Sequence, residues 1–295
     1  MSIRKEDLTI LIPTLNEAGA IGQLIDELKS KNYNVLVVDG NSTDGTVEIV
    51  RSKGVRLIFQ EGKGKADAIR TGLKHINTPY LLVMDGDYTY DPEDIEKFLD
   101  PGFDEIIGVR KRDNMKRSHR FGNWLITKVF SILFGTSLRD VCSGMYLLRT
   151  EVAREVEFRS KGFSVEVEIA AHIISTGGRV GEVEINYRKR IGDPKLRKIH
   201  GLSIILSVIR LMLEYNPLFF MFLASSAALI PGAIILGYVA FELIFRGINH
   251  YVWALAGISL SGVGYISLLL AILALYLKRL EYRIMRKFTR RPYLE

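Results

Sequence analysis

Two long apolar runs near the C-terminal end limit what this chain can fold into. Residues 219–245 carry one charged side chain, Glu242, and residues 251–277 carry none. Each run exceeds the ~20 residues that an apolar helix needs to cross a bilayer. A pair of buried core helices is the alternative, but neither run has the amphipathic period expected of a half-buried helix. We therefore predict two transmembrane helices, joined into an antiparallel hairpin by the linker 246–250.

The flanks of the two runs predict how the hairpin is oriented. Six basic residues lie within positions 188–198 and seven follow position 277, whereas the linker has one arginine and one histidine. By the positive-inside rule, both termini are expected on the cytoplasmic side of a multi-pass protein of the cell membrane. Basic residues this close to membrane spans favour anionic lipid over nucleic acid as a partner. The hairpin also leaves homo-oligomerisation open.

The segment before the hairpin predicts a further membrane-associated element. Over residues 199–216, apolar side chains recur at helical spacing, namely Ile204, Ile205, Val208, Leu211 and Met212. This pattern predicts an amphipathic helix in the interface plane, with a core-packing helix as the alternative. The expected organisation is a cytosolic domain over 1–198, this interfacial helix over 199–216, the hairpin over 217–277 and a basic cytoplasmic tail over 278–295.

Residues 8–110 alternate between strand and helix signals. Apolar strands are predicted over 8–12, 34–38, 55–59 and 80–84, and a helix follows each of the first three, with the second and third over 46–53 and 66–76. This βα order predicts an α/β fold with a mostly parallel sheet and helices on both faces. A single cysteine, Cys142, and a polar N-terminus without a visible signal peptide fit a cytoplasmic location.

Polar motifs follow the predicted strands, at the sheet edge where ligands bind in such folds. Asp85-Gly86-Asp87 follows the fourth strand, and two carboxylates this close repel each other. A Mg²⁺ or Mn²⁺ ion that also bridges substrate phosphates is the usual remedy, and a solvated Asp-Gly turn is the alternative. Gly62-Lys63-Gly64-Lys65 opens a helix, where backbone N–H groups and ammonium groups favour phosphate. Residues 13–17 and 39–44 should converge on the same edge.

Four motifs, taken in order, resemble glycosyltransferase family 2. They are Pro13-Thr14-Leu15-Asn16-Glu17, Val38-Asp39-Gly40-Asn41-Ser42-Thr43-Asp44-Gly45-Thr46, Gly62-Lys63-Gly64-Lys65-Ala66 and the DxD motif Asp85-Gly86-Asp87. The chain is most similar to the branch that acts on polyprenyl phosphates, which includes dolichol-phosphate mannose synthase. Residues 140–146 and 187–196 resemble segments of the same branch. The resemblance implies the GT-A fold, a Rossmann-like nucleotide-sugar-binding domain, and such enzymes also carry appended membrane helices.

The resemblance assigns roles to individual residues. Asp85 and Asp87 would hold the metal and, with Arg110, form the catalytic group. The donor would be bound by Pro13, Leu15, Glu17, Val38, Asp39, Lys65, Asp85, Gly86, Asp87, Arg110, Arg190 and Lys195. Arg188 or Arg190 would supply the arginine of the branch's basic stretch, and Glu166 or Glu168 would orient the sugar or the acceptor. These two choices stay open at this point.

Several residues after position 110 are candidates for binding the acceptor. Arg117, Arg120 and Asn123 precede an apolar helix predicted over 124–134 and are candidates for holding an acceptor phosphate, together with Arg188. A solvated loop is the alternative for the first three. A phosphate monoester has a second pKa of ~6, so it is a nucleophile near neutrality without a strong general base. The five histidines, at positions 75, 119, 172, 200 and 250, are accordingly interpreted as structural or surface residues.

The implied activity is a metal-dependent hexosyltransferase reaction with inversion. A sugar would move from a nucleotide diphosphate sugar to a polyprenyl or dolichyl phosphate, in glycan or glycoprotein assembly. Gly40 stands where mannose synthases carry a second Asp, and Leu15 replaces a usual Tyr, so UDP-glucose or UDP-N-acetylglucosamine is favoured over GDP-mannose. The alternatives are a family 2 enzyme with another acceptor and a non-catalytic membrane-anchored protein that binds nucleotide sugar or anionic lipid.

Overall fold

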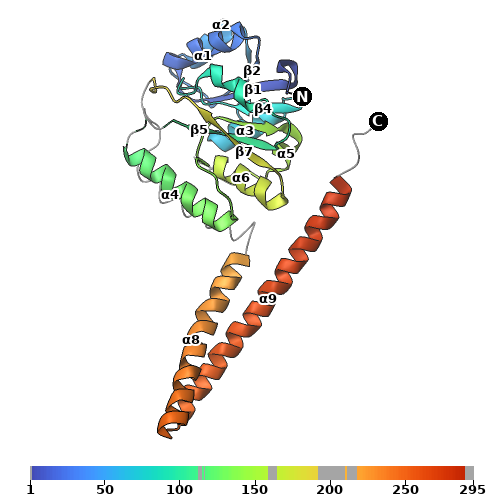
Figure 1. Ribbon diagram of the computed structural model, residues 1–295. Coiled ribbons are helices and arrows are strands. Elements are labelled where there is room, and N and C mark those ends of the chain that lie inside the picture. Colours follow the sequence, from blue (N-terminus) through green and yellow to red (C-terminus); the bar gives the residue numbers. More distant parts are fainter. Residues whose placement is uncertain are drawn as a thin grey trace. The chain divides into compact units, whose positions relative to one another are not determined.

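The chain consists of two compact units, Met1–Tyr215 and Asn216–Glu295. The structure is a computed structural model and describes residues 2–111, 115, 117–158, 165–191, 210 and 218–289. Figure 1 shows the first unit as a sheet with helices on both faces and the second as two long helices. The predicted interfacial helix over 199–216 and the donor residue Lys195 lie outside the described residues, apart from Arg210.

The strands of the first unit form one mixed sheet. Within the described residues it has seven strands in the order β3-β2-β1-β4-β6-β5-β7. They are β1 (Leu8–Thr14), β2 (Asn34–Asp39), β3 (Arg56–Phe59), β4 (Tyr80–Val83), β5 (Glu105–Arg110), β6 (Tyr146–Arg149) and β7 (Val180–Ile185). Only β6, among these strands, runs antiparallel to its neighbours, β4 and β5. The prediction of a mostly parallel α/β sheet is confirmed, and the antiparallel β6 is a feature that the sequence pattern did not predict.

Helices cover both faces of the sheet because alternate strand residues point to opposite sides. On one face Ile10 and Ile12 of β1 pack with helix α1 (Ala18–Ser30), and on the other Leu11 packs with helix α3 (Lys65–Leu73). The buried positions of α1 recur at helical spacing, at Ala20, Ile21, Leu24, Ile25 and Leu28. Truncating one such leucine to alanine typically costs about 2–5 kcal/mol of stability.

The remaining helices of this unit complete the two layers. They are α2 (Thr46–Ser52), α4 (Arg117–Phe134), α5 (Thr150–Glu155) and α6 (Val165–Thr176), with 3-10 helices η1 (Lys5–Asp7) and η2 (Pro92–Phe98). The sequence predicted a helix over 124–134, with a solvated loop as the alternative for Arg117, Arg120 and Asn123, but α4 begins at Arg117. The first turn contains Arg117, His119 and Arg120, which are not strong helix breakers, and no proline precedes the apolar stripe. The helix therefore starts seven residues earlier than predicted, and the loop alternative does not hold.

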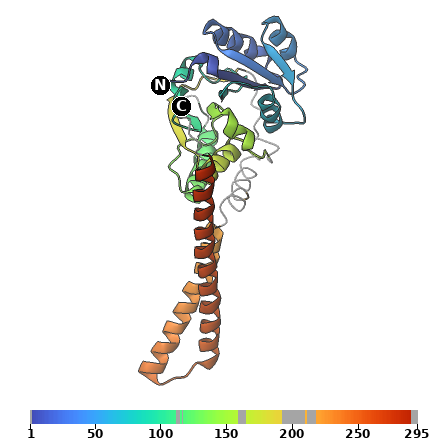
Figure 2. The same cartoon turned by 90° about the vertical axis from the view of Figure 1, so that its right-hand side faces the viewer.

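The second unit is a pair of apolar helices that lie side by side (Figure 2). They are α8 (Leu218–Arg246) and α9 (Tyr251–Thr289), and Phe220–Arg246 and Tyr251–Leu277 are long and apolar enough to cross a membrane. Glycines allow the backbones to approach closely: a Cβ at Gly232 would lie 2.5 Å from Ser261 Oγ, and one at Gly264 would lie 2.5 Å from the Leu229 nitrogen. Helix α9 continues past Leu277 to Thr289, into the segment expected to be a tail.

Candidate functional site

The loops after β1 and β2 are joined at the carboxyl end of the sheet. The Asn16 nitrogen donates to Ser42 Oγ at 2.8 Å, and the Thr43 nitrogen donates to Asn16 Oδ1 at 2.8 Å. Asn16 and Asn41 both have positive φ, a conformation that asparagine tolerates better than most residues. The two motifs predicted to line a donor pocket therefore form one continuous wall, as expected from adjacent parallel strands.

The predicted donor residues in this wall do not all reach its surface. Asp39 is fully buried, and it accepts hydrogen bonds from Thr14 Oγ1 and from the nitrogen and Oγ of Ser42. Val38 packs in the core on the α3 face, so its side chain does not line the wall. Leu15 is 44% exposed and Pro13 is half-buried. Asp39 thus shapes the loop, and Leu15 is the residue that presents an open apolar surface.

The Asp85 carboxylate is held by Lys65. Lys65 Nζ lies 2.5 Å from Asp85 Oδ1 and 2.6 Å from Glu166 Oε1. Although burial opposes it, the charges of Asp85 and Glu166 raise the pKa of Lys65 well above its usual value. The sequence predicted that Lys65 faces phosphate, whereas its ammonium here lies between two carboxylates. Of the two glutamates left open, Glu166 is the one that reaches this site.

The Asp87 carboxylate is held by Arg190. Arg190 Nη1 donates to Asp87 Oδ2 at 2.7 Å, and Nη2 donates to Glu17 Oε1 at 2.9 Å. Asp87 Oδ1 accepts from Thr89 Oγ1 at 2.6 Å. Burial and the nearby Asp85 charge raise the pKa of Asp87 above its usual value. Of the two arginines left open by the sequence, Arg190 is the one that contacts the DxD motif and the first donor motif.

The two aspartates fit a divalent cation that is shared with a substrate. Among the described residues no group of three or more His, Cys, Asp or Glu side chains is arranged to hold a metal ion by itself. Mg²⁺ is usually bound through one or two carboxylates plus substrate phosphates, so a pair is sufficient. Burial and then repulsion from Asp85 raise the pKa of Asp87, and a cation at the pair would relieve the repulsion. The donor set is therefore suited to a metal that arrives with a diphosphate.

Arg110 forms a buried ion pair that the sequence did not predict. Its Nε and Nη2 each lie 2.7 Å from an oxygen of Asp140, and the guanidinium lies 5.6 Å from the ring centroid of Tyr187. Tyr187 in turn makes an edge contact with Tyr90, whose hydroxyl accepts from the Gly144 nitrogen at 2.7 Å. Asp140 and Gly144 both belong to the segment 140–146, which resembles the polyprenyl-phosphate branch. That resemblance was the sequence signal that could have pointed to these two residues as part of the site.

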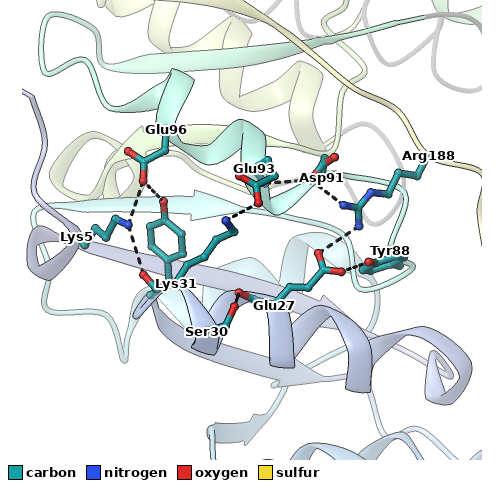
Figure 3. A network of polar contacts seen from close by, with 10 residues as sticks. Lys5, Glu27, Ser30, Lys31, Tyr88, Asp91, Glu93, Glu96 and Arg188 are labelled. Atoms are coloured by element: carbon teal, nitrogen blue, oxygen red, sulfur yellow. Dashed lines mark hydrogen bonds and ion pairs between the residues drawn. The ribbon is translucent and has the colours of Figure 1, made fainter.

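Arg188 lies in a separate polar network (Figure 3). Its Nη2 donates to Asp91 Oδ1 at 2.8 Å, its Nη1 donates to Glu27 Oε2 at 3.3 Å, and its guanidinium stacks on Tyr88 at 4.5 Å from the ring centroid. Tyr88 also donates a hydrogen bond to Glu27. The predicted acceptor residue is thus engaged with α1 and the start of η2, and it fixes the strand-like segment that carries Arg190.

The other acceptor candidates lie on α4. Arg120 and Asn123 line a small surface hollow together with Asp140, which connects them to the Arg110 pair. The other residues of this hollow are Met115, Trp124 and Arg139. The side chain of Arg117 lies outside the described part of the chain. The structure therefore brings two of the four predicted acceptor residues together beside Arg110.

Comparisons with known proteins agree with this architecture. The family model "Glycosyl transferase family 2" matches residues 9–156. The glycosyltransferase AglJ of Haloferax volcanii is 36% identical over 266 residues, which cover 86% of this chain and 87% of that protein. A dolichyl-phosphate hexose transferase of the same organism is 34% identical over 220 residues, 71% of this chain and 95% of that protein.

Solved structures share the fold of the first unit. Glucosyl-3-phosphoglycerate synthase from Mycobacterium tuberculosis in complex with UDP has a TM-score of 0.59 at 18% identity, covering 70% of this chain and 79% of that chain. The same enzyme with Mn²⁺, UDP and phosphoglyceric acid has a TM-score of 0.57 at 18% identity, covering 70% of this chain and 78% of that chain. The predicted GT-A fold is confirmed, and the chain belongs to glycosyltransferase family 2.

Proposed function

We propose that this glycosyltransferase moves a hexose from a nucleotide diphosphate sugar to a polyprenyl or dolichyl phosphate at a membrane. The observation that carries the proposal is the Asp85–Asp87 pair at the carboxyl end of the sheet. Lys65 forms an ion pair with Asp85, and Arg190 forms one with Asp87. The lipid acceptor is supported by the two membrane-length helices of the same chain and by a relative named for dolichyl phosphate. We place the first unit on the cytoplasmic side.

The chemistry requires stabilisation of a leaving diphosphate. Mg²⁺ or Mn²⁺ bound by Asp85 and Asp87 would supply positive charge there. Arg190 already spans Asp87 and Glu17, so its guanidinium lies where donor phosphates would approach that carboxylate pair. Arg110 is oriented by Asp140 through Nε and Nη2, and a fixed cation costs little reorganisation during the reaction.

The acceptor needs positioning more than activation. A phosphate monoester is largely dianionic near neutrality, because its second pKa is ~6. Holding that phosphate in line with the sugar carbon is therefore the main task of the protein. Arg120 and Asn123, at the hollow beside the Arg110–Asp140 pair, are the described residues best suited to it. Direct attack by the phosphate oxygen would invert the anomeric carbon and give a β-linked product from an α-linked donor.

The wall formed by the first two loops favours a UDP-sugar. A Cβ at Gly40 would lie 3.3 Å from the Thr14 carbonyl oxygen, 3.3 Å from Gln60 Oε1 and 3.4 Å from Leu15 Cδ1. A side chain here would require these neighbours, one of them a backbone oxygen, to shift by a few tenths of an ångström, so the aspartate expected in GDP-mannose enzymes would need a local rearrangement. UDP-glucose and UDP-N-acetylglucosamine are accordingly the preferred donors, and GDP-mannose is the third to test.

A transfer assay with the full chain in detergent tests this proposal. Radiolabelled UDP-glucose, UDP-N-acetylglucosamine and GDP-mannose are each incubated with a polyprenyl phosphate and Mn²⁺ or Mg²⁺, and label in the lipid fraction is counted. We expect transfer from a UDP-sugar, its loss with EDTA, and a drop of about 100-fold or more in Asp87→Asn. Glu151→Gln, on exposed α5 surface, serves as the control. No lipid-linked product from any donor would refute the proposal.

A further inference from the structure

The Lys65 ammonium bridges carboxylates from two distant parts of the fold. Lys65 is the first residue of α3 and Glu166 is the second residue of α6, so the first turns of both helices meet beside Asp85. The side chains of Glu166 and Lys65 are only 8% and 15% exposed, whereas Asp85 is 33% exposed. Asp85 is therefore the member of this triad that opens toward the site, and Glu166 lies behind it.

We propose that Glu166 is a positioning residue, which acts through Lys65 to orient the Asp85 carboxylate for a divalent cation and to limit how far the ammonium neutralises it. The inference rests on the proposed function, because it concerns the same metal pair. Glu166 contacts Lys65 and is not itself placed against the donor. Its role is to control how strongly the ammonium neutralises Asp85.

The charges of the triad explain this role. A lone lysine in a buried pair would match the single charge of Asp85 and leave little attraction for a cation. With Glu166 present, one ammonium is shared by two carboxylates, at 2.5 and 2.6 Å, and the triad keeps a net charge of −1. Burial raises the pKa of Glu166, whereas the Lys65 ammonium and the N-terminal turn of α6 favour its carboxylate form.

The opposite side of Asp85 is closed by the backbone. A Cβ at Gly144 would lie 2.3 Å from Asp85 Oδ2, and the Gly144 nitrogen is fixed by its hydrogen bond to the Tyr90 hydroxyl. The carboxylate is thus confined between the Lys65 ammonium and the Gly144 backbone. Because the Gly144 backbone limits movement on that side, the position of Lys65, which Glu166 holds, sets how the Asp85 carboxylate lies.

Mn²⁺ binding to the full chain in detergent tests the inference without relying on turnover. The free Mn²⁺ signal in electron paramagnetic resonance is titrated in the presence of UDP for the wild type and for Glu166→Gln. We expect the variant to bind Mn²⁺ about 10- to 100-fold more weakly, the range typical for residues that support metal ligands from behind. Its thermal unfolding is recorded in parallel, and Glu166→Asp, which keeps the charge but shortens the side chain, should show a smaller loss.

Glu105→Gln is the matched control. Glu105 is a buried carboxyl at the start of β5, and burial and then the nearby Glu166 charge raise its pKa well above the usual value, which favours the neutral acid. Glutamine resembles that neutral acid, so Mn²⁺ affinity should match the wild type.

In a Lys65→Met background, Glu166→Gln should have no further effect, because the proposed linkage runs through the ammonium.

The outcomes separate this inference from the proposed function. If the wild type neither binds Mn²⁺ with UDP nor transfers sugar, the metal site itself is wrong, and this inference fails with it. If the wild type does both while folded Glu166→Gln and Glu166→Asp bind Mn²⁺ as tightly, the inference alone is overturned. A Glu166→Gln loss that persists undiminished in the Lys65→Met background also overturns it.

Discussion

At the scale of single residues, Gly144 limits how the Asp85 carboxylate can lie. A Cβ at this position would come within 2.3 Å of Asp85 Oδ2 and 2.9 Å of its Cγ. We expect Gly144→Ala to displace the carboxylate, and a displacement of ~1 Å in a catalytic site can cost about 100-fold in rate. The measurement is kcat/KM for sugar transfer. Gly122→Ala, where no atom lies near the added Cβ, should keep wild-type activity. Equal rates in the two variants would contradict the prediction.

Glu105 gives a pH-dependent prediction. Its folded pKa is raised, so the folded state binds more protons than the unfolded state between the two pKa values. The stability contributed by the neutral carboxyl is present below the unfolded pKa of ~4.3 and is lost as the pH rises through the folded pKa. Glu105→Gln should therefore unfold like the wild type near pH 4 and be more stable by about 1 kcal/mol or more at pH 8. Denaturant titrations at both pH values measure this, and a constant difference would argue against it.

The residues of the site were predictable where local sequence fixes their place. Asp85 and Asp87 follow an apolar strand, Lys65 opens a helix and Arg110 ends a strand, so each could be assigned to the same sheet edge. Their partners were not predictable, because pairing depends on how elements pack. Glu166 lies 101 positions from Lys65, and Asp140 lies 30 positions from Arg110. The role assigned to Arg188 as an acceptor residue stays a prediction, and its contacts to Glu27 and Asp91 favour a structural role.

At the scale of elements, the sequence likewise predicted what depends on local pattern and missed what depends on packing between elements. The β1, β2 and β4 runs were recognisable because parallel strands covered on both faces are almost continuously apolar. The direction of β6 was not recognisable, because Tyr146–Arg149 is a four-residue strand whose composition carries no directional signal. In the structure β6 lies between β4 and β5 and pairs antiparallel with both. The start of α4 was also missed, because a basic first turn resembles a solvated loop.

Helix α4 presents an exposed apolar stripe that predicts contact with lipid. Phe121, Trp124 and Ile132 are 63%, 46% and 59% exposed, and the helix contains no acidic residue. Aromatic and basic side chains together favour the membrane interface. In a Trp253→Phe variant, Trp124 is the single tryptophan. We expect brominated lipids in nanodiscs to quench its fluorescence.

Two observations decide this prediction. Trp124→Phe leaves Trp253 in a membrane-length helix, and its quenching by the same lipids is the positive control. Trp124 emission that remains characteristic of water, with strong iodide quenching and no response to brominated lipid, would exclude interfacial contact by α4.

At the scale of the whole molecule, the charge distribution predicts the topology. Basic residues gather before the first span and after the second, while the linker of the hairpin carries only Arg246 and His250. The translocated loop of a hairpin is normally the one poor in lysine and arginine. The linker should therefore face the outside, and the first unit and the end of α9 should face the cytoplasm. This predicted arrangement is also the one that the proposed donor, a nucleotide sugar of the cytoplasm, would require.

Single-cysteine labelling tests this topology directly, because Cys142 is the one cysteine of the chain. In a Cys142→Ala background, cysteines replace three exposed residues, Ser2, Asn249 and Leu280. A membrane-impermeant maleimide should label Asn249→Cys in intact cells, and should label Ser2→Cys and Leu280→Cys only in inverted vesicles. Labelling of Ser2→Cys in intact cells would reverse the orientation. Labelling of Ser2→Cys and Leu280→Cys from opposite sides would mean that the chain crosses the membrane an odd number of times, which the hairpin does not allow.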